Sequence, residues 1–273
     1  MDLPRLFREP FRRHPPNFRA HLRTWLDSPA GARLMAAETA LLDDITPAIF
    51  GFHAAQICTA RPVSMLSASR IPHRVLVATD EAATAGAEPV QLLAATGQLP
   101  FGNDSLDLVL LHHTLDFDDD PHAALREAAR VIVPGGALVV VGCNPWSLFG
   151  FLRLFHWGAL DAPWFARCIG AQRVGDWLRL LDFRIDGVES AYYLPPLQGT
   201  ASARRLGWLQ TLGQRLWPRA GMFYVLVARK SVAAMMPVRR FDRQQRPLTI
   251  GVPVAGRIGT GGTTPRHLPR NES

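Results

Sequence analysis

The segment from Leu99 to Leu138 constrains the fold more than any other part of the chain. An apolar run at Leu106–Leu111 is followed by a helical pattern at Pro121–Val131. After Pro134-Gly135-Gly136, which predicts a turn, Ala137–Val141 is apolar throughout. Continuous apolar runs are typical of strands buried on both faces, and a helix between two such strands makes them parallel. The segment therefore predicts a strand–helix–strand unit of a parallel sheet.

The same alternation continues on both sides of this segment. Further strands are expected at 53–59, 75–78, 89–94, 183–188 and 222–228, and helices at 172–181 and 206–216. Alternating strands and helices predict an α/β fold, with an open, mostly parallel sheet and helices on both faces. We expect this domain to span residues 51–232, behind an N-terminal helical cap at 18–50.

The net charge of +7 lies in the two ends of the chain. Residues 1–23 carry +4 and residues 236–273 carry +5, so the part between them sums to −2. We expect an irregular basic lead-in at 1–17 and a basic, disordered tail at 233–273. Such ends could make weak contacts with nucleic acid or a membrane surface, but a solvated tail that aids solubility is the expected role.

The three cysteines, Cys58, Cys143 and Cys168, lie far apart and form no C-x-x-C pair. Neither a disulfide framework nor a structural zinc site is expected from this spacing. The basic N-terminus has no apolar core typical of a signal peptide, and no apolar stretch is long enough to cross a membrane. We therefore expect a cytoplasmic protein with no transmembrane segment.

The Leu99–Leu138 segment also carries a family resemblance over about forty residues. The matching residues are Leu99-Pro100-Phe101, Leu106–Leu111, His112–Asp116, Asp120-Pro121, Ala124–Glu127, Arg130-Val131 and Pro134–Leu138. In this order and spacing they resemble the type-11 branch of class I S-adenosylmethionine-dependent methyltransferases. The resemblance implies a Rossmann-like sheet with an antiparallel last strand, S-adenosylmethionine as cofactor, and methyl transfer as the activity.

The resemblance also implies where the cofactor binds. Gln56 stands where the family has an acidic residue after the first strand, and Cys58 follows it. Asp80, after the second strand, has the spacing of a residue that binds the ribose hydroxyls, although it could instead cap a helix. The remaining expected cofactor contacts are Ala95, Gly97, Gln98 and Leu99 near the adenine, and His112 after the fourth strand.

One part of this cofactor site departs from the family. The loop after the first strand reads Thr59-Ala60-Arg61-Pro62 and contains no glycine. Glycine allows the backbone to approach a ligand closely because it has no Cβ. Ala95, moreover, replaces the acidic residue that the family places near the adenine amine. Both departures are expected to weaken binding of the cofactor.

His113 and Asp116 are the candidate catalytic residues, because they follow a strand at the edge of the sheet where ligands bind in open α/β folds. They could act as a base or as a polar contact to the acceptor. Alternatively, His112 and His113 could simply cap the strand. The run Asp116, Asp118, Asp119 and Asp120 could hold a metal ion, but a solvated loop before a helix is the expected role, so no metal is expected.

An aromatic segment at about 146–170 is expected to form a lid. It could cover a small apolar acceptor such as a quinone precursor or a lipid, lie at a membrane surface, or only pack on the sheet. We therefore expect a methyltransferase that acts on a small, apolar molecule. The alternatives are a non-catalytic relative that serves as a binding or regulatory module, and a nucleic-acid methyltransferase recruited through the basic ends.

Overall fold

The computed structural model describes residues 18–59, 63–79, 91–148, 150, 167–194 and 207–232. The chain divides into one unit at Met1–Ala233 and a second at Ala234–Ser273. Several sequence predictions lie outside the described residues: the lead-in at 1–17, the loop residues 60–62, Asp80, most of the lid, and the tail.

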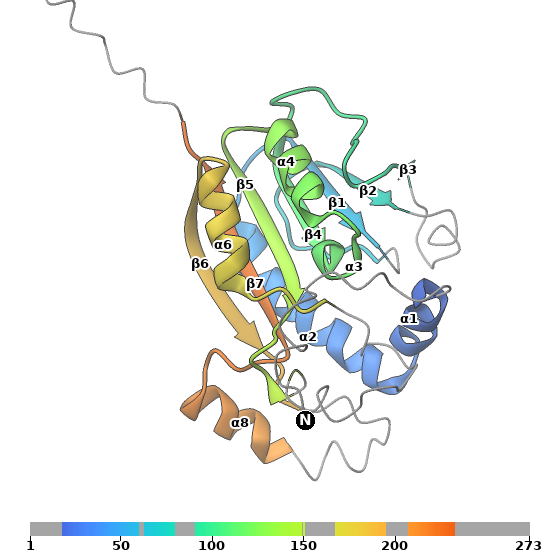
Figure 1. The fold of residues 1–273 in the computed structure, drawn as a ribbon, viewed down its shortest axis with the longest axis vertical. Coiled ribbons are helices and arrows are strands. Elements are labelled where there is room, and N and C mark those ends of the chain that lie inside the picture. Colours follow the sequence, from blue (N-terminus) through green and yellow to red (C-terminus); the bar gives the residue numbers. More distant parts are fainter. Residues whose placement is uncertain are drawn as a thin grey trace, which may run out of the picture. The chain divides into compact units, whose positions relative to one another are not determined.

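The core of the protein is a seven-stranded sheet in the order β3-β2-β1-β4-β5-β7-β6 (Figure 1). All neighbouring pairs from β3 to β5 are parallel, whereas β7 is antiparallel to both β5 and β6. This arrangement confirms the predicted Rossmann-like sheet with an antiparallel last strand. The strands are β1 His53–Cys58, β2 His73–Ala78, β3 Leu92–Leu93, β4 Leu106–His112, β5 Ile132–Cys143, β6 Phe183–Ala191 and β7 Phe223–Lys230.

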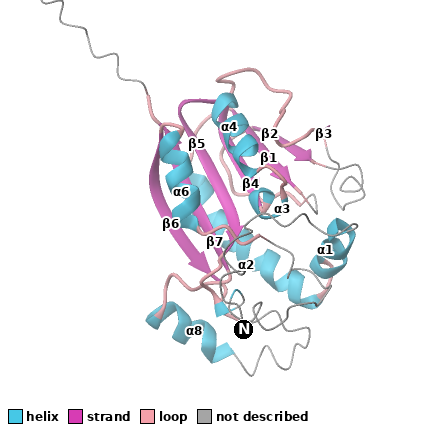
Figure 2. Ribbon diagram, viewed as in Figure 1, coloured by secondary structure: helices cyan, strands magenta, loops and turns pink. Residues whose placement is uncertain are grey.

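The helices cover both faces of the sheet, with α4 and α6 on one face and α2 on the other (Figures 1 and 2). Their bounds are α1 Phe18–Leu26, α2 Pro29–Ile45, α3 Thr114–Phe117, α4 Pro121–Val131, α6 Ala171–Leu180 and α8 Gly207–Leu216, with a 3-10 turn at Thr46–Ala48. No helix in the described ranges is long and apolar enough to cross a membrane.

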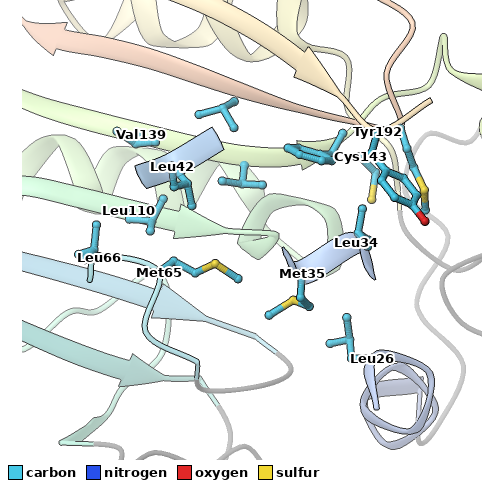
Figure 3. Close-up of a cluster of buried hydrophobic side chains, with 14 of the residues drawn as sticks. Leu26, Leu34, Met35, Leu42, Met65, Leu66, Leu110, Val139, Cys143 and Tyr192 are labelled. Atoms are coloured by element: carbon cyan, nitrogen blue, oxygen red, sulfur yellow. The ribbon is translucent and has the colours of Figure 1, made fainter. Parts of the chain in front are cut away.

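Two hydrophobic cores lie on opposite sides of the sheet because successive strand residues point to opposite faces. On one face Leu42 of α2 packs with Leu110 and Val139 (Figure 3). On the other face, Val109 and Val140 join the core formed with α4 and α6. The segment expected as an N-terminal cap at 18–50 thus contributes to the core, since Leu42 is fully buried against the sheet.

The starts of α2 and α4 follow from local capping chemistry. The Ser28 side chain accepts a hydrogen bond from the backbone N–H of Gly31, and the first helical position is a proline. Asp120 caps α4 in the same way, with its Oδ1 atom 2.9 Å from the backbone nitrogen of Ala123. The expected role of the acidic run as the lead-in to a helix is confirmed at Asp120.

One local prediction is wrong. Residues 134–136 form no turn between α4 and the next strand, because β5 already begins at Ile132. Leu106 of β4 pairs with Ile132 and Leu108 pairs with Ala137, so the extra residues form an irregular bulge inside the strand. Gly135 has a φ of +86°, a conformation that side chains rarely adopt. The Pro-Gly-Gly sequence thus serves a bulge.

Candidate active site

The candidate site lies at the carboxyl ends of β1, β4 and β5. The parallel register aligns Cys58 with His112 and His112 with Val141, so these strands end at the same edge of the sheet. In open α/β sheets this edge is where ligands bind. The site is built from the residues that follow these strands and from α2, which crosses beneath them.

A carboxylate from α2 connects the two histidines after β4. Glu38 Oε2 lies 2.9 Å from His112 Nε2, and Glu38 Oε1 lies 2.8 Å from His113 Nε2. The Glu38 side chain has no exposed surface. Both histidine side chains thus bind this buried acid.

The sequence did not predict Glu38 as a site residue. The available signal was its position on α2, where Leu34, Glu38 and Leu42 share one face at a spacing of four residues. All three are buried. An acidic residue in the middle of an apolar helix face requires a partner, and the partner lies more than seventy positions away.

His113 is held from the opposite side by Asp116. His113 Nδ1 lies 2.9 Å from Asp116 Oδ2, and the backbone N–H of Cys143 donates to that same oxygen over 2.8 Å. His113 adopts a left-handed conformation, with a φ of 51°, which directs the chain from β4 into α3. The two predicted catalytic residues are thus brought together, with both imidazole nitrogens of His113 bonded to carboxylates.

The electrostatics of this cluster favour an ion pair. Burial acts to raise the pKa of Glu38, but the positive charge of His113 and hydrogen bonds from both histidines lower it to about 2. Burial likewise acts to lower the pKa of His113, but Glu38 and Asp116 together raise it to about 10. These shifts favour a protonated His113, an imidazolium that donates one N–H to Glu38 and the other to Asp116.

A pocket opens above the histidines. Its polar wall is formed by Thr59, His112, His113 and Cys143, and its apolar wall by Leu22, Trp25, Leu26, Leu34, Phe117 and Met222. The space between these walls, including its opening to solvent, is about 450 Å³. A molecule with an apolar body and one polar end matches these two walls.

The predicted cofactor residues on β1 have partners within their own loop. Gln56 Nε2 donates to the Val63 carbonyl over 2.7 Å and to Cys58 Sγ over 3.1 Å. Gln56 Oε1 accepts from the backbone N–H of Met65 over 2.8 Å. Gln56 and Cys58 are both buried. The amide therefore shapes the segment after β1, and its role toward the cofactor stays a prediction.

The predicted adenine-binding segment is fixed to α4. The Gln98 backbone N–H donates to the Ala95 carbonyl and closes a turn around Gly97. The next residue, Leu99, is buried, and its N–H donates to Glu127 Oε1 over 2.7 Å. The Arg130 guanidinium donates to the carbonyls of Leu99 and Phe101. This leaves Ala95 and Gln98 exposed at the edge of the sheet; their contact with a cofactor stays a prediction.

Two buried hydroxyls at this edge fit a polar ligand. Thr59 and Thr79 follow β1 and β2 directly, and within the described residues neither Oγ1 atom has a hydrogen-bond partner. An unsatisfied buried polar group costs about 1–3 kcal/mol, so such groups mark places where a partner is expected. The Thr59 and Thr79 hydroxyls, at the ends of β1 and β2, thus suit a ligand rich in hydroxyl and amine groups. Neither threonine was predicted from the sequence.

Comparisons with known proteins agree with this geometry. The profile of the family described as a methyltransferase domain, type 11, matches residues 60–140. Over 209 residues the chain is 32% identical to the uncharacterised protein YafS of Escherichia coli K12, covering 76% of this chain and 80% of that protein. The chain belongs to the type-11 family of class I S-adenosylmethionine-dependent methyltransferases, and S-adenosylmethionine is the cofactor of that family.

Solved structures are similar in fold. A methyltransferase from Thermotoga maritima, described as a possible histamine N-methyltransferase, has a TM-score of 0.55 at 19% identity, covering 78% of this chain and 99% of that one. The [4+2]-cyclase SpnF has a TM-score of 0.53 at 18% identity, covering 81% and 98%. At these identities the likeness concerns the fold alone, and the second example is named for another reaction.

Proposed function

We propose that this protein transfers the methyl group of S-adenosylmethionine to a small acceptor with an apolar body and one polar end. The observation that carries the proposal is the pocket beside Thr59 and His113. It combines an apolar wall from α1 and α2 with a polar wall at the carboxyl ends of β1, β4 and β5. Burial of an apolar body stabilises binding by roughly 25 cal/mol per Å² and directs the polar end to the histidines.

In this proposal the cofactor is held at the ends of β1 and β2. The free hydroxyls of Thr59 and Thr79 would bond its polar groups, with Asp80 and Gln98 as the further contacts expected from the sequence. Leu99 supplies a buried apolar surface next to this edge. When bound, the sulfonium group of S-adenosylmethionine supplies an electrophilic methyl group.

His113 and Asp116 would position the acceptor. Both ring nitrogens of His113 are bonded to carboxylates, so the protonated ring can take a proton from an acceptor only after it has given one of its own away. This arrangement therefore suits a fixed polar contact to the acceptor better than it suits a catalytic base. Methyl transfer depends chiefly on alignment of the reacting atoms, which a rigid, buried cluster provides.

The test is isothermal titration of the full-length protein with S-adenosylmethionine and, separately, S-adenosylhomocysteine. We expect micromolar binding that weakens by about tenfold in Thr59→Val, the loss expected for one hydrogen bond to a charged or polar ligand. Thr24→Val is the matched control, because the Thr24 hydroxyl is exposed and bonds only a carbonyl of its own helix in the described contacts.

A second candidate function has its own observation. Gln56 is fully engaged by its loop, and that loop lacks the glycines of the family, so a non-catalytic binding module remains the alternative. The same titration separates the two functions. No binding at millimolar cofactor by protein shown to be folded would reject methyl transfer and favour the module.

A further inference from the structure

Three side chains of metal-ligating types meet where His112 and His113 line the pocket. The Nε2 atoms of His112 and His113 both face the carboxylate of Glu38, at 2.9 and 2.8 Å from its two oxygens. One donor atom from each of the three residues can be chosen so that all lie within 4.8 Å of one another. Two imidazoles and one carboxylate are a ligand set that zinc uses in catalytic sites.

We propose that Glu38, His112 and His113 bind one divalent transition-metal ion of the zinc type, in a site that opens into the apolar pocket. Imidazole nitrogen selects zinc and its neighbours in the first transition row, whereas magnesium and calcium prefer oxygen donors. Since zinc is commonly four-coordinate, three protein ligands leave one position for water or for the polar end of an acceptor.

The first support is the isolation of the carboxylate. Glu38 is completely buried, and its ion pairs within the described residues are with the two histidines; no lysine or arginine of those ranges pairs with it. A buried acid usually has a permanent cation or a metal ion beside it. A pair of histidines is an unusual substitute, because imidazole is neutral in its ordinary state.

The second support is Asp116, which occupies the place of an outer carboxylate. Histidines that ligate a metal through one nitrogen commonly donate the other N–H to a carboxylate, which fixes the ring. His113 does this with Asp116 over 2.9 Å, while the Cys143 N–H holds the same carboxylate oxygen in place. The Nε2 atom of His113 is thereby directed at Glu38.

The third support is the balance of charge. Glu38 and Asp116 bring two formal negative charges into a buried cluster. Within the described residues no lysine or arginine pairs with either carboxylate, and a divalent cation carries the charge that balances both. Since an uncompensated buried charge is costly, the cluster suits a 2+ ion.

A competing ligand set shares His113. Asp116 and Cys143 also lie near it, with Cys143 Sγ 3.7 Å from His113 Nδ1. That nitrogen already faces Asp116, and Asp116 Oδ2 also accepts the Cys143 N–H. The Glu38 set keeps the bond between His113 and Asp116, and the ion replaces the hydrogen bonds between the two histidines and Glu38. Only the set with Cys143 contains a sulfur ligand, so an experiment that detects sulfur distinguishes the two sets.

The experiment uses the full-length protein, stripped with a chelator and titrated with Zn²⁺ alone by calorimetry and with Co²⁺ alone by visible absorption. We expect one ion per chain and a tetrahedral Co²⁺ spectrum. Glu38→Gln and His112→Gln should each weaken binding by at least about 100-fold, and Asp116→Asn by about 10- to 100-fold.

The matched control is His53→Gln/His73→Gln. These two histidines are exposed and stack on each other, with ring centroids 5.2 Å apart, so they are where an adventitious ion would bind. Binding that persists in this double variant and disappears in His112→Gln supports the site. Loss of binding only in the double variant, or no micromolar binding by folded wild type, rejects it.

X-ray absorption of the Zn²⁺-loaded wild type keeps the test decisive if a variant fails to fold. We expect nitrogen and oxygen ligands with the scattering pattern of two imidazoles. A sulfur ligand would place the ion at a cysteine and contradict the proposal. Metal binding is measured without cofactor. If the metal does not bind, the proposed methyl transfer is unaffected, and if the cofactor does not bind, the proposed metal site is unaffected.

Discussion

The carboxylate of Glu38 and the imidazole of His113 lie 2.8 Å apart although 75 positions separate them in the sequence. The contact joins α2, on one face of the sheet, to the turn that follows β4. A helix that builds the hydrophobic core thus also supplies an acid to the two histidines that line the pocket, so the fold and the site share this helix.

The first prediction concerns the stability of the metal-free protein. Glu38→Ala removes one partner of a buried ion pair and should lower the free energy of unfolding by about 3–5 kcal/mol. Urea denaturation in the presence of a chelator measures the change. Glu189→Ala is the control, because Glu189 is exposed on β6 and its removal should change stability by less than about 0.5 kcal/mol. Equal effects of both substitutions would contradict the assigned pair.

The second prediction separates stability from ligand binding at Thr59 and Thr79. Since neither hydroxyl has a partner in the described residues, Thr59→Val and Thr79→Val should leave the melting temperature of the ligand-free protein unchanged or raise it. Both should weaken S-adenosylmethionine binding. Differential scanning calorimetry and titration calorimetry measure the two effects.

Thr114→Val is the comparison for this pair. Its hydroxyl is buried and donates to the Ile57 carbonyl over 3.1 Å, so the substitution should lower stability by about 1 kcal/mol or more. A similar loss of stability in Thr59→Val would show that the Thr59 hydroxyl has a structural partner and would remove it from the proposed cofactor site.

The sequence was informative where contacts are local. The apolar runs of β4 and β5 and the helix between them predicted the centre of the sheet, and the capping residues predicted the start of α2. Glu38 was missed because its role depends on a contact between distant segments, which periodicity cannot reveal. The bulge at Gly135 was missed because Pro-Gly-Gly suits both a turn and a bulge, and only the pairing of β4 with β5 decides between them.

The third prediction concerns Gln56, where the family has an acidic residue. Gln56→Glu restores that residue type but should destabilise the protein by about 1–3 kcal/mol. The substitution places a carboxylate against the Val63 carbonyl, to which the Gln56 amide now donates. Urea denaturation at neutral pH measures the loss.

Gln91→Glu is a matched control for the same change of group. Gln91 Oε1 accepts a hydrogen bond from the backbone N–H of Leu76, and a carboxylate accepts such a bond equally well. This variant should therefore be close to wild type in stability. If Gln56→Glu is also neutral, the amide of Gln56 does not anchor its loop, and its assignment to the cofactor becomes the better explanation.

The last prediction is a pH dependence of the contact between Glu127 of α4 and Leu99 in the predicted adenine-binding segment. The hydrogen bond from Arg130 lowers the pKa of Glu127 from its ordinary value of 4.5, and the Leu99 N–H adds to this effect. A group with a lowered pKa in the folded protein contributes stability above its unfolded pKa and loses it as the pH falls through the folded pKa. The contribution of Glu127 should therefore be complete at neutral pH and be lost as the pH falls below the ordinary pKa of 4.5 and through the lower pKa of the folded state.

Glu127→Gln isolates this contribution, because an amide can accept the Leu99 N–H but does not titrate. The variant should be less stable than wild type at pH 7, and the difference should shrink as the pH is lowered from 5 to 3. Hydrogen exchange of the Leu99 amide, followed across this range, reports this contact directly: its protection should fall with pH in wild type and stay level in Glu127→Gln. A difference in stability that is constant across the range would mean that the contact depends on the shape of the side chain and not on its charge.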